Sequence, residues 1–335
     1  MIAAVLRELN APLELAEIGV RPPQLGQVKV RMIATGICGA QLAEIRGEKG
    51  NAKFLPHLLG HEGCGVVEEI GIGVSKVRPG GRVVLHWRKG DGIESDFPRY
   101  RYEGREIQSG KVVTFAETVC VSENRVTPVP DSTPAELAAL LGCGLSTALA
   151  TLEQEAALKA GETLLVIGAG GIGVNLLRAA EIAGATELTC WDTVPSKREM
   201  VEGFKARYVC ERPTPKVCGC FDVVVDTVGA SETVEAGAKM LSPGGRMILV
   251  GQPRGPVGVE HGGALFAGEG QTIKATQGGG FVPQRDIPRW LRLHREGRLS
   301  TAGIITHRLP FLEINAALDL MRAGKAGRVL LTFAG

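Results

Sequence analysis

Three glycines in the segment IGAGGIG constrain the fold of this chain more than any other feature of its sequence. Gly168, Gly170 and Gly173 follow the apolar run TLLVI and open a helical pattern over residues 171–183. In a G-x-G-x-x-G motif the first glycine permits a tight turn, the second lets the backbone approach a pyrophosphate, and the third lets the helix pack closely on the strand. Unpaired N–H groups at the helix start favour a phosphate, so we expect these glycines and Gly171 to bind a dinucleotide.

The next expected strand, ELTCW, is followed by Asp192, which bears on the choice of dinucleotide. A carboxylate there accepts hydrogen bonds from the adenosine ribose and repels a 2′-phosphate, which favours NAD over NADP. Lys197, which we count among the cofactor-binding residues, and Arg198 keep NADP as an alternative. The purely structural alternative is a glycine-rich connection in which Asp192 caps a helix.

The hydrophobic pattern divides the 335 residues into two domains. Residues 1–145 hold short β-rich runs broken by glycine and proline, which is typical of a mostly antiparallel, barrel-like domain. Residues 146–276 alternate near-continuous apolar strands with helices, which indicates a doubly wound parallel sheet covered on both faces. The remainder, 277–335, predicts two helices and a final strand. The expected fold class is therefore α/β.

Composition argues against several classes of partner. Lys and Arg total 38 against 36 Asp and Glu, and a net charge of +2 is too small to attract nucleic acid or an anionic membrane. We find no apolar run of about 18 residues, and Glu8 and Glu14 interrupt the region where a signal peptide needs an apolar block. We therefore expect a cytoplasmic protein whose eight cysteines do not form a disulfide framework.

Cys38, His61 and Cys143 form a candidate metal site. Two thiolates and one imidazole are a known catalytic zinc set, in which water or substrate takes the fourth position. The three residues are far apart in the sequence, so only a folded domain can unite them. The structural alternative is that both cysteines are buried and inert.

The motifs around these residues resemble those of the medium-chain, zinc-dependent alcohol dehydrogenases over essentially the whole chain. LLGCGLSTALAT is similar to the family's third-ligand segment, and FLEINAALDLMRAGKAGRVLL to its C-terminal helix and strand. Cys64 departs from the family's zinc signature, which is otherwise matched by Gly60, His61, Glu62, Gly65, Gly71 and Val74.

The resemblance implies a GroES-like catalytic domain, residues 1–145 completed by 277–335, around a Rossmann NAD-binding domain, residues 146–276. One zinc would lie in the cleft between them, and the protein would be a homodimer or homotetramer. Cys38, His61 and Cys143 would hold the zinc, and Glu62 would approach it or govern ligand exchange. The other implied contacts are Thr147 and Ile172 with the nicotinamide, Val250 with the carboxamide end, Arg328 with the pyrophosphate, and Trp87 at the substrate pocket. We also expect Ala40 at this pocket, and His86 because it adjoins Trp87.

The implied activity is hydride transfer between an alcohol, including polyols and amino alcohols, and NAD to give an aldehyde or ketone. One alternative is an NADPH-dependent zinc carbonyl reductase. Another is a non-catalytic family member that only binds the cofactor. A comparison of kcat/KM for the two cofactors distinguishes the NAD-dependent dehydrogenase from the first alternative. Zinc analysis together with turnover of a panel of alcohols distinguishes it from the second.

Two departures from the family occur directly after the first zinc ligand. Ala40 replaces a serine or threonine whose hydroxyl begins the family's proton relay, so water, a substrate hydroxyl or another group must carry the proton. Gln41 replaces an aspartate, and a neutral amide against His61 would make the imidazole less basic.

A third departure is the lack of clustered cysteines between Cys64 and Cys120, from which we expect no structural zinc. Residues 88–110 occupy that place and predict a long surface loop. Its residues 99–105 would bind an anionic substrate group, contact another subunit or remain solvated. The other single histidines, at positions 57, 261, 294 and 307, and the segment 218–220 predict structural or surface roles.

Overall fold

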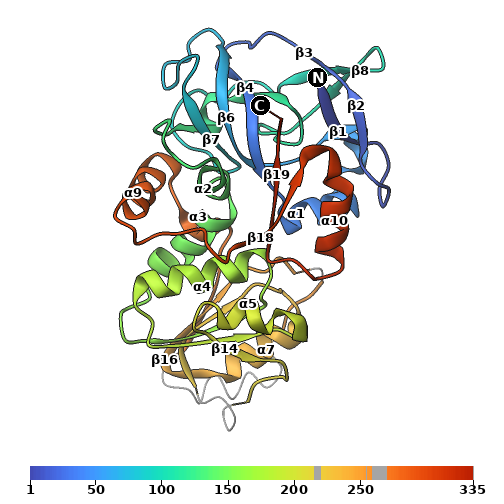
Figure 1. Cartoon of the computed structure of the whole chain (residues 1–335). Coiled ribbons are helices and arrows are strands. Elements are labelled where there is room, and N and C mark those ends of the chain that lie inside the picture. The colour runs from blue at the N-terminus through green and yellow to red at the C-terminus, as the bar shows by residue number, and fades with distance from the viewer. Residues whose placement is uncertain (215–219, 254, 259–269, 335) are drawn as a thin grey trace. The chain divides into compact units, whose positions relative to one another are not determined.

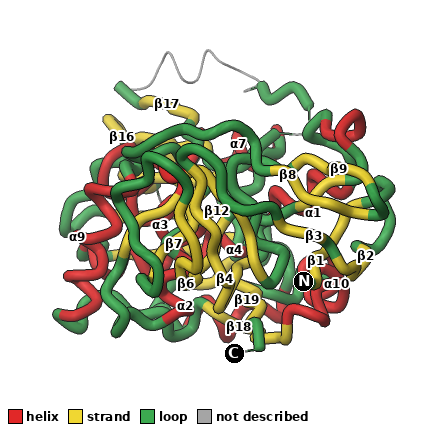
Figure 2. The backbone as a smooth tube through the Cα atoms, turned by 90° about the horizontal axis from the view of Figure 1, so that it is seen from above, coloured by secondary structure: helices red, strands yellow, loops and turns green. Residues whose placement is uncertain are grey.

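The computed structural model describes residues 1–214, 220–253, 255–258 and 270–334. These residues form two compact units, which Figures 1 and 2 show in two views. No helix in the described part of the chain has the length and apolarity to cross a bilayer. The first unit consists of Met1–Gly144, Val282–Thr301 and Ile305–Gly335, and the second of Leu145–Phe281 and Ala302–Ile304.

The first unit is built around a mixed, mostly antiparallel sheet in which β4 (Gln27–Gly36) is central. Strands pair with it on both edges, and its valines and small residues are largely buried. This confirms the expected mostly β domain. The strand order is β11–β7–β6–β4–β19–β18, with β10 also on β4: β6 (Glu62–Ile70), β7 (Arg82–His86), β10 (Thr118–Ser122), β11 (Val126–Pro128), β18 (Ile305–Pro310) and β19 (Arg328–Thr332).

Helices and a smaller sheet complete this unit. Ile45 of α1 belongs to the same buried cluster as Ile314 and Leu318 of α10, so α1 is anchored on the C-terminal segment. The tail contains β18 in addition to the two helices and the strand that we expected. The elements are β1 (Ile2–Leu6), β2 (Glu14–Glu17), β5 (His57–Leu58), α1 (Gly39–Ile45), α2 (Ala135–Leu140), α9 (Pro283–Arg295) and α10 (Ile314–Arg322).

The segment 88–110 is not the long surface loop that the sequence predicts. It contains a hairpin, β8 (Arg99–Tyr102) and β9 (Arg105–Gln108), which pairs with β3 (Gly19–Val20) in a three-stranded sheet (Figure 2). The pattern of RYRY explains the difference, because its tyrosines are buried while its arginines are exposed, as on a strand covered on one face. Tyr100 is fully buried and is therefore not available to a substrate.

The second unit is the expected doubly wound domain. Its described strands all pair in parallel, in the order β14–β13–β12–β15–β16–β17. The glycine motif lies between β12 and α4, which spans the predicted helix residues. The elements are α3 (Gly144–Ala150), β12 (Thr163–Ile167), α4 (Gly171–Ala183), β13 (Glu187–Trp191), α5 (Arg198–Glu202), β14 (Arg207–Val209), β15 (Phe221–Asp226), α7 (Ser231–Lys239), β16 (Leu241–Leu249) and β17 (Thr272–Ala275).

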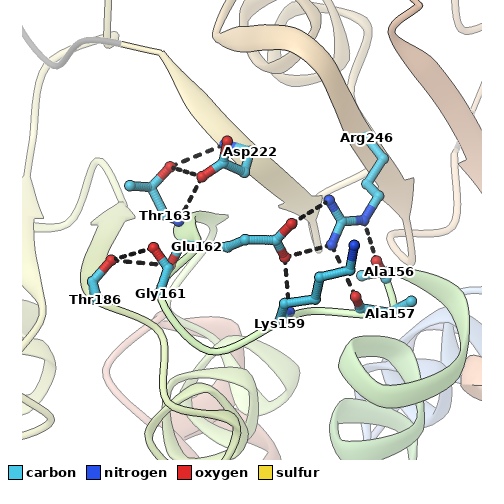
Figure 3. Close-up of polar contacts among 9 residues, drawn as sticks. All are labelled: Ala156, Ala157, Lys159, Gly161, Glu162, Thr163, Thr186, Asp222 and Arg246. Atoms are coloured by element: carbon cyan, nitrogen blue, oxygen red, sulfur yellow. Dashed lines mark hydrogen bonds and ion pairs between the residues drawn. The ribbon is translucent and has the colours of Figure 1, made fainter.

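Polar side chains tie together the amino ends of three strands of this sheet (Figure 3). Arg246 of β16 donates to both Glu162 oxygens, at 3.1 and 2.6 Å, and to the carbonyls of Ala156 and Ala157. Thr163 donates to Asp222 through its backbone N–H and its hydroxyl, both at 2.9 Å. These contacts hold the amino ends of the strands in register. The glycine motif lies at the other end of the sheet, after the carboxyl end of β12.

Candidate metal centre and cofactor site

The first unit brings Cys38, His61 and Cys143 together. Cys38 ends the turn after β4 and caps α1, His61 directly precedes β6, and Cys143 lies between α2 and α3. Their ligand atoms all lie within 4.8 Å of one another. Side chains that are tens of residues apart in the sequence therefore lie together in the structure, as a metal site requires.

The chemistry of these three side chains fits zinc. His61 Nε2 is buried and has no hydrogen-bond partner among the described residues, so the imidazole directs an unsatisfied nitrogen into the cluster. A hydrogen bond with Cys143, and then interaction with His61, hold the pKa of the Cys38 thiol well below its usual value. The thiolate is the form of cysteine that binds metals. Two sulfurs and one imidazole leave one of four tetrahedral positions for a ligand.

Gln41 positions two of these residues. Its amide nitrogen lies 2.7 Å from His61 Nδ1, and its amide oxygen accepts the Cys38 backbone N–H at 3.0 Å. The Gln41 side chain is almost completely buried. The contact between Gln41 and His61 that we considered from the sequence is therefore present, although its effect on imidazole basicity stays a prediction.

Glu62 and Arg328 form a fully buried ion pair beside this cluster. A Glu62 oxygen also accepts the Gly144 N–H at 3.0 Å. A side chain at Gly36 would place its Cβ 2.5 Å from Glu62 Oε1, so the glycine at the end of β4 makes room for the carboxylate. Glu62 lies outside the three-ligand cluster, and its role in ligand exchange stays a prediction, as does the pyrophosphate contact of Arg328.

The glycine motif of the second unit has the geometry that a phosphate site needs. Gly168 has a φ of 96°, which other residues rarely adopt. A Cβ at Gly173 would lie 1.8 Å from the Gly168 carbonyl oxygen, whereas a Cβ at Gly170 would meet no atom of the described residues within 4 Å. Gly173 is thus required for packing, and Gly170 faces open space at the first turn of α4.

Asp192 lies where the sequence placed it, directly after β13, but its carboxylate already has partners within the unit. It accepts the Ala169 N–H at 2.7 Å and the Val194 N–H at 2.9 Å. Lys197 Nζ contacts Asp192 Oδ2 at 2.9 Å, and both side chains are buried. The glycine loop and Lys197 therefore hold in place the carboxylate that we expected to bind the ribose.

A cavity of about 350 Å³ opens at the carboxyl ends of β15, β16 and β17, and Val250 lines it. Ligands of doubly wound sheets bind at the carboxyl ends of the strands. Ile172 is half-buried in the first turn of α4, and Thr147 is buried on α3. The cavity is lined by Asp226, Gly229, Val234, Leu249, Val250, Gly251, Gln252, Pro253, Val257, Ala275, Thr276 and Gln277.

The expected substrate-pocket residues differ in their surroundings. His86 is fully buried, and its ring nitrogens contact the Arg88 carbonyl at 2.7 Å and the Thr127 hydroxyl at 3.0 Å. It therefore presents no free nitrogen to a substrate, because both are used to hold the strand end. Trp87 and Ala40 are half-buried.

The other single histidines and cysteines give no second site within the described residues. His57, His294 and His307 each hydrogen-bond to a nearby residue, as expected for structural roles. Cys220 is exposed. Cys218 and His261 lie outside the described residues.

The chain matches two family models and many known proteins. Residues 24–131 match the Alcohol dehydrogenase GroES-like domain, and residues 171–296 match the Zinc-binding dehydrogenase domain. The chain is 30% identical to an NDMA-dependent alcohol dehydrogenase of Amycolatopsis methanolica, over 96% of each chain.

Solved structures agree with these matches over the whole chain. An alcohol dehydrogenase zinc-binding domain protein from Burkholderia ambifaria superposes with a TM-score of 0.90 at 26% identity, covering 100% of this chain and 99% of that one. Benzyl alcohol dehydrogenase from Acinetobacter calcoaceticus gives a TM-score of 0.87 at 25% identity, with 99% of each chain covered.

Proposed function

The chain belongs to the medium-chain, zinc-type alcohol dehydrogenase family, and from that premise we propose that it oxidises an alcohol to an aldehyde or ketone with zinc and NAD. Residues 1–145 and 277–335 would carry the metal, and residues 146–276 the dinucleotide. The observation that carries the proposal is the convergence of two cysteine sulfurs and one histidine nitrogen within 4.8 Å.

Each residue of the first unit has a defined task in this proposal. Cys38, Cys143 and His61 hold the metal, and the Gln41 amide orients the imidazole and the Cys38 backbone. Bound zinc would supply a Lewis acid that polarises the substrate oxygen. The buried pair of Glu62 and Arg328 keeps two charges balanced next to the cluster without exposing either of them to water.

The second unit supplies the dinucleotide site in this proposal. The pyrophosphate would lie at the start of α4, where Gly170 leaves space. The first N–H groups of a helix have no partner within the helix and favour a phosphate. Asp192 would accept the ribose hydroxyls and disfavour a 2′-phosphate. The nicotinamide end would enter the cavity that Val250 lines.

Metal analysis of the purified protein and activity assays with a panel of alcohols test the proposal. We expect one zinc per chain and NADH formation with neutral alcohols, polyols or amino alcohols, with kcat/KM higher for NAD than for NADP. Cys143→Ala should lose both zinc and activity, whereas Cys120→Ala, a buried cysteine outside the cluster, should retain both. Zinc-free protein that oxidises alcohols at the same rate would refute the metal's role.

The Amycolatopsis relative supports a second candidate, alcohol oxidation that depends on NDMA. The same panel run with NDMA in place of added NAD distinguishes the two candidates. Turnover that requires NDMA and does not respond to added NAD would favour the second.

A further inference from the structure

Gln41 is the third residue of helix α1, and its side chain turns back over the start of the helix. Its amide oxygen accepts the backbone N–H of Cys38, the N-cap residue, at 3.0 Å. Its amide nitrogen lies 2.7 Å from His61 Nδ1. The Gln41 side chain is 1% exposed, so bulk water does not reach the amide. One buried amide therefore contacts two of the three candidate metal ligands.

The two nitrogens of the His61 ring have different surroundings. Nε2 is buried and has no hydrogen-bond partner in the described part of the chain, so it is the nitrogen available to a metal. A nitrogen binds a metal through its lone pair, so the proton of the neutral ring must then be on Nδ1. Metal-binding histidines almost always donate this second N–H to a carboxylate, a carbonyl or water. Here Nδ1 faces an amide nitrogen, which is a donor and not an acceptor.

Rotation of the Gln41 amide by half a turn does not remove this conflict. The oxygen would then face Nδ1, but the amide nitrogen would face the Cys38 N–H, which is also a donor. Either orientation leaves two buried donors against each other, and an unsatisfied buried donor costs free energy. With the ring proton on Nε2, in contrast, the amide nitrogen donates to Nδ1 and both contacts are hydrogen bonds. The contacts of Gln41 therefore favour the form of the ring that does not bind a metal through Nε2.

Resting on the proposed function and its zinc, we propose that Gln41 weakens zinc binding and so sets the metal affinity of this site. Gln41 is a positioning residue that acts through His61. Its amide holds both ligands in place, but it stabilises the ring proton on the nitrogen that the metal must take. A glutamate at this position has the same length and two acceptor oxygens, so it can accept the Cys38 N–H and the Nδ1 N–H together.

Gln41→Glu tests this role, with Gln24→Glu as the matched control. Gln24 is an exposed glutamine outside the cluster, so its replacement adds the same charge to the protein. Metal-free protein is titrated with zinc in competition with a chelating dye of known affinity. We expect Gln41→Glu to bind zinc about 10–100-fold more tightly than the wild type, and Gln24→Glu to bind it as the wild type does. Wild-type zinc affinity in Gln41→Glu would overturn the proposal.

A second readout separates hydrogen bonding from the added charge. The ¹⁵N resonances of the His61 ring, assigned as those missing from His61→Gln, report which nitrogen carries the proton. In metal-free protein at about pH 8, where an ordinary histidine is neutral, we expect the proton on Nε2 in the wild type and on Nδ1 in Gln41→Glu. A wild-type ring with its proton on Nδ1 would overturn the proposal without any variant. Tighter zinc binding by Gln41→Glu with the proton on Nε2 in both proteins would assign the effect to charge alone, and would also overturn it.

The same measurements distinguish failure of this proposal from failure of the proposed function. Wild-type protein that binds no zinc, or that binds zinc and oxidises no alcohol, would overturn the proposed function. Zinc binding and alcohol oxidation by the wild type, with equal zinc affinity in Gln41→Glu, would overturn only the role of Gln41.

Discussion

Replacement of Gly173 by alanine should destabilise the second unit, because its new methyl group would collide with backbone. The Cβ would lie 1.8 Å from the Gly168 oxygen and 2.9 Å from the Gly168 carbonyl carbon. No side chain can rotate away from this contact, so α4 must move off β12. The change therefore tests whether close packing of helix on strand depends on this one glycine.

The magnitude follows from two opposing terms. Alanine favours a helix over glycine by about 1 kcal/mol. Overpacking costs about 1–3 kcal/mol, and a backbone clash belongs at the upper end of that range. The expected net loss is about 2 kcal/mol, which corresponds to a fall in Tm of roughly 4–8 °C for a unit of this size.

Gly170→Ala is the matched control within the same motif. In the described part of the chain no atom lies within 4 Å of its Cβ, and its φ of −85° is open to alanine. The loss of a preferred helix cap should cost less than about 1 kcal/mol. The methyl group would, however, occupy space that we assign to the pyrophosphate, so NAD affinity should fall at least about tenfold.

Thermal unfolding of cofactor-free protein, followed by calorimetric titration with NAD, separates these effects. Gly173→Ala should lower Tm, and Gly170→Ala should weaken NAD binding with little change in Tm. The reasoning is wrong if Gly173→Ala unfolds at the wild-type temperature, or if Gly170→Ala binds NAD as tightly as the wild type.

Two further predictions concern stability. Arg246→Ala should lower the free energy of unfolding by about 1.5–3 kcal/mol in urea, because Arg246 loses charged hydrogen bonds to Glu162 in a largely buried clamp. Arg198→Ala, which breaks an exposed ion pair, should cost less than about 0.5 kcal/mol, and equal losses would contradict this ranking. Burial lowers the pKa of His86 to about 3. Its unfolded pKa is about 6.5, so the unfolded chain binds more protons between these values. The stability due to neutral His86 is therefore complete above about pH 6.5 and is lost as pH falls toward 3; a His86→Gln protein should show a shallower loss of Tm with acid, and an equally steep loss would count against it.

Local patterns were sufficient to predict the doubly wound domain and its glycine motif. The strand TLLVI, the glycines and the helix are consecutive, so their geometry is decided by neighbours in the sequence. The metal ligands are far apart, and residue types alone left inert cysteines as an alternative. The resemblance to a family supplied their grouping, and the structure brings Cys38, His61 and Cys143 together.

Features that depend on partners distant in sequence were missed. The sequence predicts that Tyr100 and Tyr102 lie in a polar loop. In the structure β3 pairs with the hairpin, and both tyrosines pack into the core on one face of it. His86 looked like a pocket residue because it adjoins Trp87, but Thr127 of β11 takes its second ring nitrogen.

The pairing of β19 with β4 has a consequence for synthesis on the ribosome. β4 ends at Gly36, whereas β19 begins at Arg328, so nearly the whole chain is translated between the two strands. At about 5–20 residues per second, the early strand waits tens of seconds for its neighbour. The second unit, whose main segment is continuous, can mature during that delay, and the metal-binding half closes last, when its final strand leaves the exit tunnel.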